Sequence, residues 1–341
     1  MPSTVKTHPT GSLADADADA EAACADTRTG APQPDGVGLG LDAGGTHTRW
    51  ALADAAGQVV ASGEVPAMAG QQLASSEGQQ AMVDTLHQLA HDLDGYQKPH
   101  ALVAGITGFD AQAMPQWRRL AAAALQLPEA QVRALSDIEL ACAAAFAPGQ
   151  GVVLIAGTGA IAAHLDAQGV LHRAGGRGAV IDDAGGGHWI ARRALQHIWR
   201  GEDTAPGSWA SSPLARQVFA QMGGSSWAHT RQWVYGATRG ELGTLALAVA
   251  QAAAQDPVAA ALLSQAGQEL ARLVLALQHR LGVQPVALSG RVFDLHPLVE
   301  NSLRRALPPG LSVQRLQTPA HHAAARLAAR VAKAAPPQSN F

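Results

Sequence analysis

Hydrophobic positions near the start of the chain follow the spacing of short β-strands. Residues 38–43 are apolar, residues 48–53 alternate between apolar and polar, and residues 58–62 form a third short segment. The turns Gly44-Gly45-Thr46-His47 and Asp54-Ala55-Ala56-Gly57 separate these segments. Short alternating runs joined by glycine-containing turns are typical of antiparallel strands. The pattern predicts a three-stranded meander whose first turn is rich in glycine.

The same pattern occurs a second time. Residues 152–156, 161–165 and 170–173 again read as three short strands, with the turn Gly157-Thr158-Gly159 after the first. Four turn residues recur at a separation of 112 positions: Gly45 and Gly157, Thr46 and Thr158, Asp54 and Asp166, Gly57 and Gly169. An internal repeat of this kind predicts two similar halves, each of which opens with a hairpin.

Helical and strand-like patterns alternate elsewhere. Buried strands are expected at residues 101–106, 132–135 and 285–288, and helices at residues 78–93, 116–125, 138–146, 189–200, most of 212–282, and 320–333. Strands that alternate with helices favour a mainly parallel sheet. The predicted fold class is α/β with two related domains.

Length and composition agree with two globular domains behind a tail. The chain has 341 residues, of which 47% are hydrophobic and 15% are charged, enough to bury a sizeable core. Residues 1–35 carry an alanine–acid alternation without large apolar side chains and are expected to be a disordered tail. The expected domains are residues 36–147 and residues 148–334, the second with a helical insertion.

Charge and cysteine content exclude several classes of protein. Lys and Arg total 24 against 27 Asp and Glu, which gives a net charge of −3. A chain without excess positive charge is not expected to bind nucleic acid or an anionic membrane through its net charge. No apolar run reaches the about 18 residues of a membrane span, and the N-terminus does not resemble a signal peptide. Two cysteines, Cys24 and Cys142, cannot form a disulfide framework or a four-cysteine metal site. A reducing, cytoplasmic location is expected.

The first glycine turn is a candidate phosphate site. Backbone N–H groups of Gly44 and Gly45 and the hydroxyl of Thr46 can bind phosphate oxygens, and Asp42 before them can hold a hydrated Mg²⁺. An ordinary Gly-Gly hairpin explains the same residues about equally well. Residues 38–43 also fit the dinucleotide fingerprint GxGxxA, but that motif needs a helix directly after it, and a strand follows here.

The turn Gly157-Thr158-Gly159 is the second candidate. The repeat relates it to the first turn, so that two glycine turns could grip a triphosphate from two sides. Leu154 occupies the position equivalent to Asp42, which leaves the metal-binding acid to the first turn alone. A plain hairpin is the alternative for this turn if it is considered by itself.

Asp137 is the candidate general base. It lies between a predicted strand and a predicted helix, where ligand-binding residues collect in α/β sheets, and a carboxylate there can accept the proton of an attacking hydroxyl. The alternative role is that of a helix N-cap, a common use of aspartate.

Two glycine-containing segments complete the candidates. In residues 175–195 glycines flank Asp182 and Asp183, which suits sugar hydroxyls, although a flexible loop with acids before a helix is the alternative. In residues 288–293 a glycine after a buried strand could admit an adenine base, or could form a simple strand-to-helix turn.

Taken in order, five segments resemble the actin-like ATPase and sugar kinase superfamily. Within it they are most similar to the BadF/BadG/BcrA/BcrD ATPase family and its N-acetylglucosamine kinases. The segments are LDAGGTHTRWAL, ALSDIELA, LIAGTGA, AGGRGAVIDDAGGGHWIARRAL and PVALSGRVF, within about residues 37–330. The resemblance implies two ribonuclease-H-like domains with ATP and sugar in the cleft between them.

The resemblance also implies roles for individual residues. It assigns ATP phosphates to Gly44, Gly45, Thr46, Gly157, Thr158 and Gly159, adenosine to Ser289 and Gly290, and the metal to Asp42. It makes Asp137 the base on the sugar 6-hydroxyl. It places Gly176, Arg177 and Asp183 at the amino sugar. The implied cofactors are ATP and Mg²⁺, the implied partner is a small amino sugar, and a homodimer stays open.

The chain departs from the family pattern in the acceptor region. Arg177 stands where tryptophan is usual, Asp182-Asp183-Ala184 where Gly-Asp-Glu is usual, and Arg291 where a second glycine is usual. Residues 65–72 lack an asparagine that some members place near the sugar. Arg177 could favour an acceptor with a carboxylate, such as a muramic acid derivative.

These observations predict an ATP-dependent kinase that phosphorylates the 6-hydroxyl of an amino sugar, with N-acetylglucosamine as the leading acceptor. Glucosamine and N-acetylmuramate are alternative acceptors. An ATP-driven activator of a reductase or dehydratase and a sugar sensor without catalysis are the alternatives from other classes.

Overall fold

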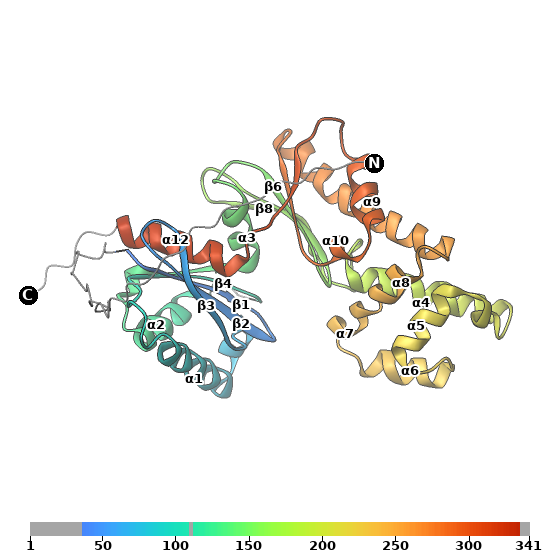
Figure 1. The fold of residues 1–341 in the computed structure, drawn as a ribbon, viewed down its shortest axis with the longest axis horizontal. Helices are drawn as coiled ribbons and strands as arrows, with labels where there is room; N and C mark the ends of the chain where they lie inside the picture. Colours follow the sequence, from blue (N-terminus) through green and yellow to red (C-terminus); the bar gives the residue numbers. More distant parts are fainter. Residues whose placement is uncertain (1–35, 109–111, 335–341) are drawn as a thin grey trace, which may run out of the picture. The chain divides into compact units, whose positions relative to one another are not determined.

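The computed structural model describes residues 36–108 and 112–334, which form an α/β fold with two five-stranded sheets (Figure 1). The expected fold class is confirmed. The tail predicted for residues 1–35, with Cys24, lies outside the described residues. Within the described ranges, no helix combines the length and apolarity that crossing a membrane requires.

The first sheet has the strand order β3-β2-β1-β4-β5. The predicted meander is confirmed as β1 (Gly38–Ala43), β2 (His47–Ala53) and β3 (Val59–Pro66). β4 (Ala101–Ile106) pairs in parallel with β1, and β5 (Val132–Ser136) pairs in parallel with β4. The carboxyl ends of three parallel strands therefore meet at one edge, where binding residues of α/β sheets collect.

The second sheet repeats this design. Its order is β10-β9-β6-β7-β8, which matches the first sheet when it is followed from β8 to β10. The meander is β6 (Val152–Ala156), β7 (Ala160–Leu165) and β8 (Leu171–Gly175), and the parallel strands are β9 (Val286–Ser289) and β10 (Val313–Arg315). The internal repeat inferred from the turn residues is thus visible in the topology.

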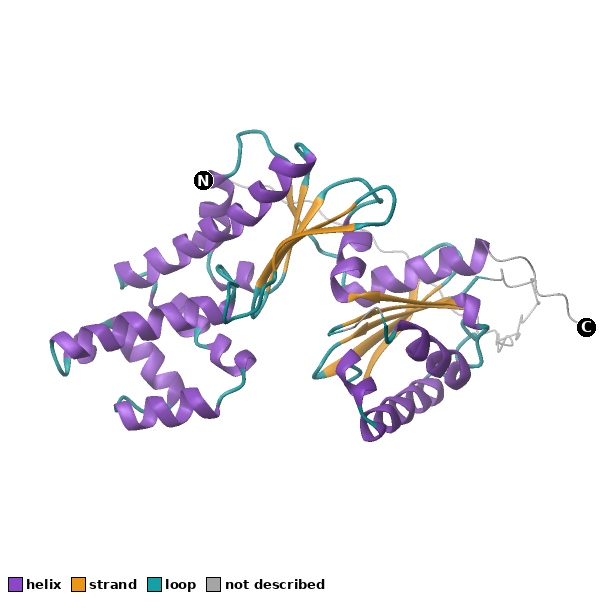
Figure 2. Ribbon diagram, turned by 180° about the vertical axis from the view of Figure 1, so that it is seen from behind, coloured by secondary structure: helices purple, strands orange, loops and turns teal. Residues whose placement is uncertain are grey.

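Helices cover both sheets (Figure 2). They are α1 (Ser76–Asp92), α2 (Met114–Leu125), α3 (Asp137–Ala145), α4 (Gly187–Thr204), α5 (Pro213–Met222), α6 (Trp227–Gly236), α7 (Arg239–Thr244), α8 (Ala246–Ala252), α9 (Pro257–Leu281), α10 (Val292–Leu295), α11 (Pro297–Ala306) and α12 (Ala320–Ala334). The predicted helices are present. The sequence pattern gave no expectation of β10, α10 or α11.

Alternation along each central strand divides its side chains between two cores. Leu39 and Leu41 of β1 pack with α1 and α2, whose Leu86 and Trp117 are fully buried. In the second sheet, Leu154 of β6 belongs to the core that α4 and α9 share. Burial of such side chains contributes about 2 kcal/mol each.

The last helix departs from the expected domain division. The sequence pattern predicts residues 320–334 as part of the second domain, but α12 packs against β1, β2 and β4 of the first sheet. Its Ala324 and Ala328 share a core with Val103 of β4. Conversely, Cys142 of α3 is buried with Val153 of β6. Each half therefore gives one helix to the other half's sheet, which a linear division of the chain does not represent.

Two glycines of β1 explain how α12 comes so close. A Cβ on Gly38 would overlap the backbone of Ala325 and Ala329, and a Cβ on Gly40 would overlap the backbone of His321 and Ala325. These are the glycines of the GxGxxA pattern. Their physical role is to let an alanine-rich helix lie directly on the strand, so the pattern needs no dinucleotide to explain it.

Candidate active site

The first glycine turn joins β1 to β2 and leaves its backbone open. Gly44 N donates to His47 O at 3.2 Å, which closes the turn. Gly45 and Thr46 are exposed, and a Cβ on Gly45 would meet no atom within 4 Å. The open backbone and the Thr46 hydroxyl together suit a phosphate ligand.

Asp42 lies on the face of β1 that carries Gly38 and Gly40. It is half-buried, and its cross-strand neighbour in β2 is Arg49. Burial raises the pKa of the Asp42 carboxyl, the Arg49 charge lowers it, and the charge of Asp137 raises it further. Asp42, in β1, and Asp137, directly after β5, both belong to the carboxyl edge of the parallel strands.

Asp137 is the first residue of α3, and it does not serve as the helix cap. Ser136 is the N-cap: its hydroxyl accepts from Glu139 N at 3.2 Å, and Glu139 Oε2 accepts from Ser136 N at 2.8 Å. This capping box satisfies the helix start. The alternative interpretation of Asp137 as an N-cap is therefore wrong, and its carboxylate is available for another role.

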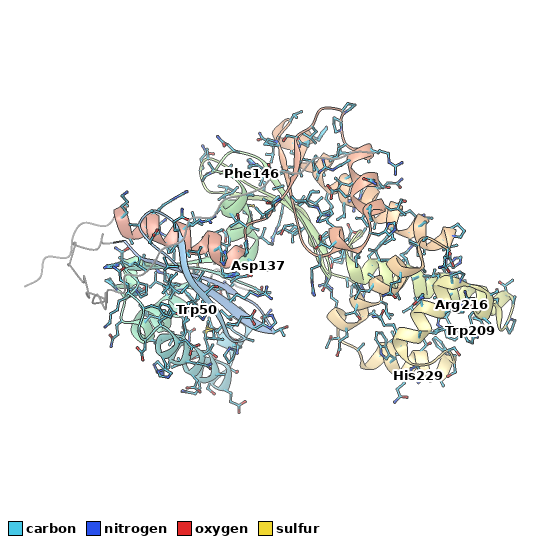
Figure 3. All side chains as sticks on the ribbon, in the orientation of Figure 1. Trp50, Asp137, Phe146, Trp209, Arg216 and His229 are labelled. Carbon is cyan, nitrogen blue, oxygen red and sulfur yellow. The ribbon has the colours of Figure 1, made fainter. Side chains whose placement is uncertain are left out.

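Asp137 is labelled in Figure 3, and a threonine fixes its carboxylate. Thr107, directly after β4, donates from Oγ1 to Asp137 Oδ2 at 3.1 Å, and its backbone N donates to Ala43 O at 2.9 Å. Burial raises the pKa of Asp137, while the Thr107 hydrogen bond opposes that rise. A half-buried carboxylate with a raised pKa, held in one orientation, is suited to act as a general base.

The second glycine turn is held by the start of α4. Gly187 N donates to Gly157 O at 2.9 Å, and His188 N donates to Thr158 O at 3.0 Å. A Cβ on Gly186 would lie 2.7 Å from backbone atoms of Thr158 and Gly159. The glycines at 186 and 187 therefore serve close packing of two backbone segments, where the sequence suggested approach to a ligand.

A pocket of about 280 Å³ opens beside this turn. Gly157 and Thr158 of the turn are among the residues that line it. The other lining residues are Gly187, Gly240, Gly243, Thr244, Ala246, Leu247, Arg291, Val292, Asp294 and Leu295. The size and the largely apolar lining suit a nucleoside, with its phosphates directed toward the turn.

The predicted adenosine residues stand next to the pocket. Gly290 has φ +104°, and a Cβ there would overlap Ala156 O, so the glycine is needed for a close turn against β6. Arg291 and Val292, which follow it, do line the pocket, whereas Ser289 and Gly290 are not among the lining residues. Sequence analysis expected helices in this region but did not assign α7 and α8 to the site, although the small residues Gly240 and Gly243, three positions apart on one helix face, line the pocket.

The acceptor candidates occupy different environments. Gly176 has φ +64°, and its N donates to Ala160 O at 2.9 Å. Arg177 is exposed, and its guanidinium has no hydrogen-bond partner among the described residues. Asp183 is buried and paired with Arg239 of α7, while Asp182 pairs with Arg272 of α9 at 2.9 Å.

The carboxylates at this sheet edge are of the kind that a Mg²⁺ ion bound to a nucleotide takes as ligands. Across the described ranges, no group of three or more His, Cys, Asp or Glu side chains could hold a metal ion. Asp42 alone, on an edge with Asp137, is the arrangement expected where Mg²⁺ arrives bound to phosphates and takes one or two protein carboxylates.

Comparison with known proteins agrees with this geometry. The sequence profile of the BadF/BadG/BcrA/BcrD ATPase family matches residues 39–319. The chain belongs to this family. Membership of an ATPase family implies ATP binding.

Solved structures with the same fold include sugar kinases. A candidate N-acetylglucosamine kinase from Chromobacterium violaceum matches at a TM-score of 0.64 and 28% identity, over 86% of this chain and 99% of that one. A second candidate N-acetylglucosamine kinase, from Porphyromonas gingivalis, matches at a TM-score of 0.66 and 17% identity, over 86% of this chain and 96% of that one. A ROK family glucokinase from Streptomyces griseus, in complex with glucose and AMPPNP, matches at a TM-score of 0.54 and 18% identity, over 87% of this chain and 99% of that one. No curated protein matches the chain.

Proposed function

We propose that this BadF/BadG/BcrA/BcrD family member transfers the γ-phosphoryl group of ATP to the 6-hydroxyl of an amino sugar, with N-acetylglucosamine as the acceptor. The observation that carries the proposal is the Asp137 carboxylate. It is released from capping by Ser136, held by Thr107 and placed on the same sheet edge as Asp42. The likeness at 28% identity to a candidate N-acetylglucosamine kinase supports the acceptor class.

In the proposed reaction, the Asp137 carboxylate accepts the proton of the sugar hydroxyl. The hydroxyl oxygen forms a bond to the γ-phosphorus while the bond from phosphorus to the β,γ-bridging oxygen breaks, and ADP leaves. The backbone and hydroxyl donors of the two glycine turns hold the phosphate oxygens and stabilise the charge on the transferred group. Mg²⁺ carried by the nucleotide, with Asp42 nearby, would neutralise part of that charge.

An acceptor screen tests the proposal. ADP release is measured with N-acetylglucosamine, glucosamine, N-acetylmuramate and glucose, and the product is examined by ³¹P NMR for a 6-phosphomonoester. The proposal expects sugar-dependent ADP release that is highest with N-acetylglucosamine. Sugar-independent ADP release with no phosphorylated product would contradict it.

The exposed guanidinium of Arg177 supports N-acetylmuramate as a second acceptor. Because this arginine has no partner among the described residues, it can pair with a lactyl carboxylate, an interaction that is strong when charge-assisted. Arg177→Trp is expected to lower kcat/KM for N-acetylmuramate about tenfold and to leave that for glucosamine unchanged. If the ratio of kcat/KM for N-acetylmuramate to kcat/KM for glucosamine does not change in Arg177→Trp, N-acetylmuramate is excluded as the second acceptor.

The reductase-activator alternative has no support in the environment of Cys142. This thiol is buried in the core between α3 and the second sheet, and burial raises its pKa to about 12. Cluster and metal ligation require a thiolate, so Cys142 is poorly placed to provide one.

The hydrogen bond from Thr107 predicts the pH dependence of transfer. Deprotonated Asp137 is the active form, so kcat/KM rises with pH through its raised pKa. Thr107→Val removes a donor that stabilises the carboxylate, and the acid limb is expected to move upward by about one pH unit. The control is Thr85→Val on α1, whose hydroxyl donates to Ala81 O at 3.0 Å. An acid limb that stays in place in Thr107→Val would contradict this role.

A further inference from the structure

A buried carboxylate next to the second glycine turn holds an arginine. The Asp183 side chain is 4% exposed, and its Oδ2 accepts a hydrogen bond from Nη2 of Arg239. No other side chain in the described ranges donates to this carboxylate. A carboxylate so poorly exposed is costly to bury without a partner, and the guanidinium provides that partner. Asp183 therefore restricts Arg239 to one position.

The ion pair lies directly against the turn. A Cβ on Gly159 would be 2.6 Å from Oδ2 and 2.8 Å from Cγ of Asp183, and would overlap Nη2 of Arg239. The next residue, Gly240, lines the pocket together with Gly157 and Thr158. The guanidinium is thus fixed where the turn and the pocket meet.

Arg239 keeps most of its donors for a ligand. A guanidinium has five N–H donors in a planar fork, and one of its nitrogens is engaged by Asp183. The side chain is 45% exposed. Guanidinium groups bind phosphate through pairs of parallel hydrogen bonds, which is why arginine is common where polyphosphates are recognised.

We propose that Arg239 binds the polyphosphate chain of ATP and that Asp183 is its positioning residue. The inference rests on the proposed function. A nucleoside in the pocket between Arg291 and Thr158 directs its phosphates along Gly157–Gly159, and this path reaches the Arg239 guanidinium. This assignment differs from the sequence-based expectation that Asp183 binds the amino sugar.

Calorimetric titration with adenosine, ADP and ATP tests the inference on the full chain. Arg239→Ala is expected to weaken the binding affinity for ATP and ADP about ten- to hundredfold and to leave the affinity for adenosine unchanged. Arg239→Lys should recover part of the loss, because lysine keeps the charge without the fork. Arg231→Ala, an exposed arginine of α6 away from the turn, is the matched control and should bind like the unmodified chain.

Asp183→Asn separates positioning from sugar binding. We expect weaker ATP binding, unchanged adenosine binding and an increased KM for ATP. Unchanged ATP affinity in Arg239→Ala overturns the inference, as does an Asp183→Asn variant that loses only sugar affinity. If Asp183→Asn does not fold, the ATP affinities of Arg239→Ala and Arg239→Lys still decide whether Arg239 binds the polyphosphate. Lack of ATP binding by the unmodified chain would instead overturn the proposed function together with this inference.

Discussion

Asp137→Asn is expected to lower kcat for phosphoryl transfer by about 10²- to 10⁴-fold. Asparagine has nearly the same shape, and its amide oxygen can keep one of the two hydrogen bonds that the carboxylate accepts, from Thr107 Oγ1 at 3.1 Å and from Ile138 N at 2.9 Å. It cannot take the proton of the acceptor hydroxyl. The capping box of Ser136 and Glu139 does not involve residue 137, so α3 should keep its start and the protein its fold.

Steady-state kinetics and ATP titration together measure this effect. The expected signature is a large loss in kcat with ATP affinity close to that of the unmodified chain, and with the acid limb of the pH profile lost. Asp84→Asn on α1, an exposed carboxylate bonded to Gln80, controls for charge and should transfer normally. Asp137→Asn activity within a factor of about three of the unmodified chain would exclude Asp137 as the base.

The parts of the fold that sequence predicts are those fixed by local chemistry. The turns Gly44–His47 and Asp166–Gly169 follow from glycine and aspartate, as Asp166 Oδ1 accepts from Val170 N at 2.8 Å whatever else surrounds the hairpin. Because these turns recur at one spacing, the repeated meander was also predictable. Asp42 and Asp137 could be placed for a related reason, since each lies at the carboxyl end of a parallel strand.

Long-range packing sets the parts that sequence did not predict. The alanine pattern of residues 320–334 predicts a helix, but only the glycine surface of β1 decides which sheet receives it. The Arg239–Asp183 pair joins residues 56 positions apart, and no local pattern indicates it. Residues 292–306 form two short helices, α10 of 4 residues and α11 of 10 residues, and helices this short give little sequence for a pattern to be recognised.

Gly186 illustrates how a motif can be found and its reason misjudged. A glycine-rich segment near acids suggested approach to a ligand, whereas the structure uses Gly186 to bring the start of α4 against Thr158 and Gly159. The segment still matters for the candidate site, because it fixes the turn that phosphate would contact. The segment keeps the turn Gly157–Gly159 rigid, and electrostatic stabilisation of a transferred phosphoryl group requires donors that are held in place.

Gly40→Ala is expected to destabilise the protein by about 3 kcal/mol, since overpacking of a close interface costs up to this amount or more. The added Cβ would overlap Ala325 N and His321 O. Both are backbone atoms of the region where α12 begins, so no side-chain rotation relieves the overlap and the helix must move away from β1. That movement opens the cores containing Ala51 and Val103.

Urea unfolding measures the loss in the free energy of unfolding. Thermal unfolding should show a Tm lowered by roughly 5 °C for a chain of this size. Gly236→Ala in α6 is the control, because a Cβ there meets no atom within 4 Å and alanine favours the helix. Ala325→Gly, added to Gly40→Ala, should restore nothing, since the overlap is with backbone. Full stability in Gly40→Ala, or its recovery in the double variant, would show that α12 does not rest on this strand as the structure has it.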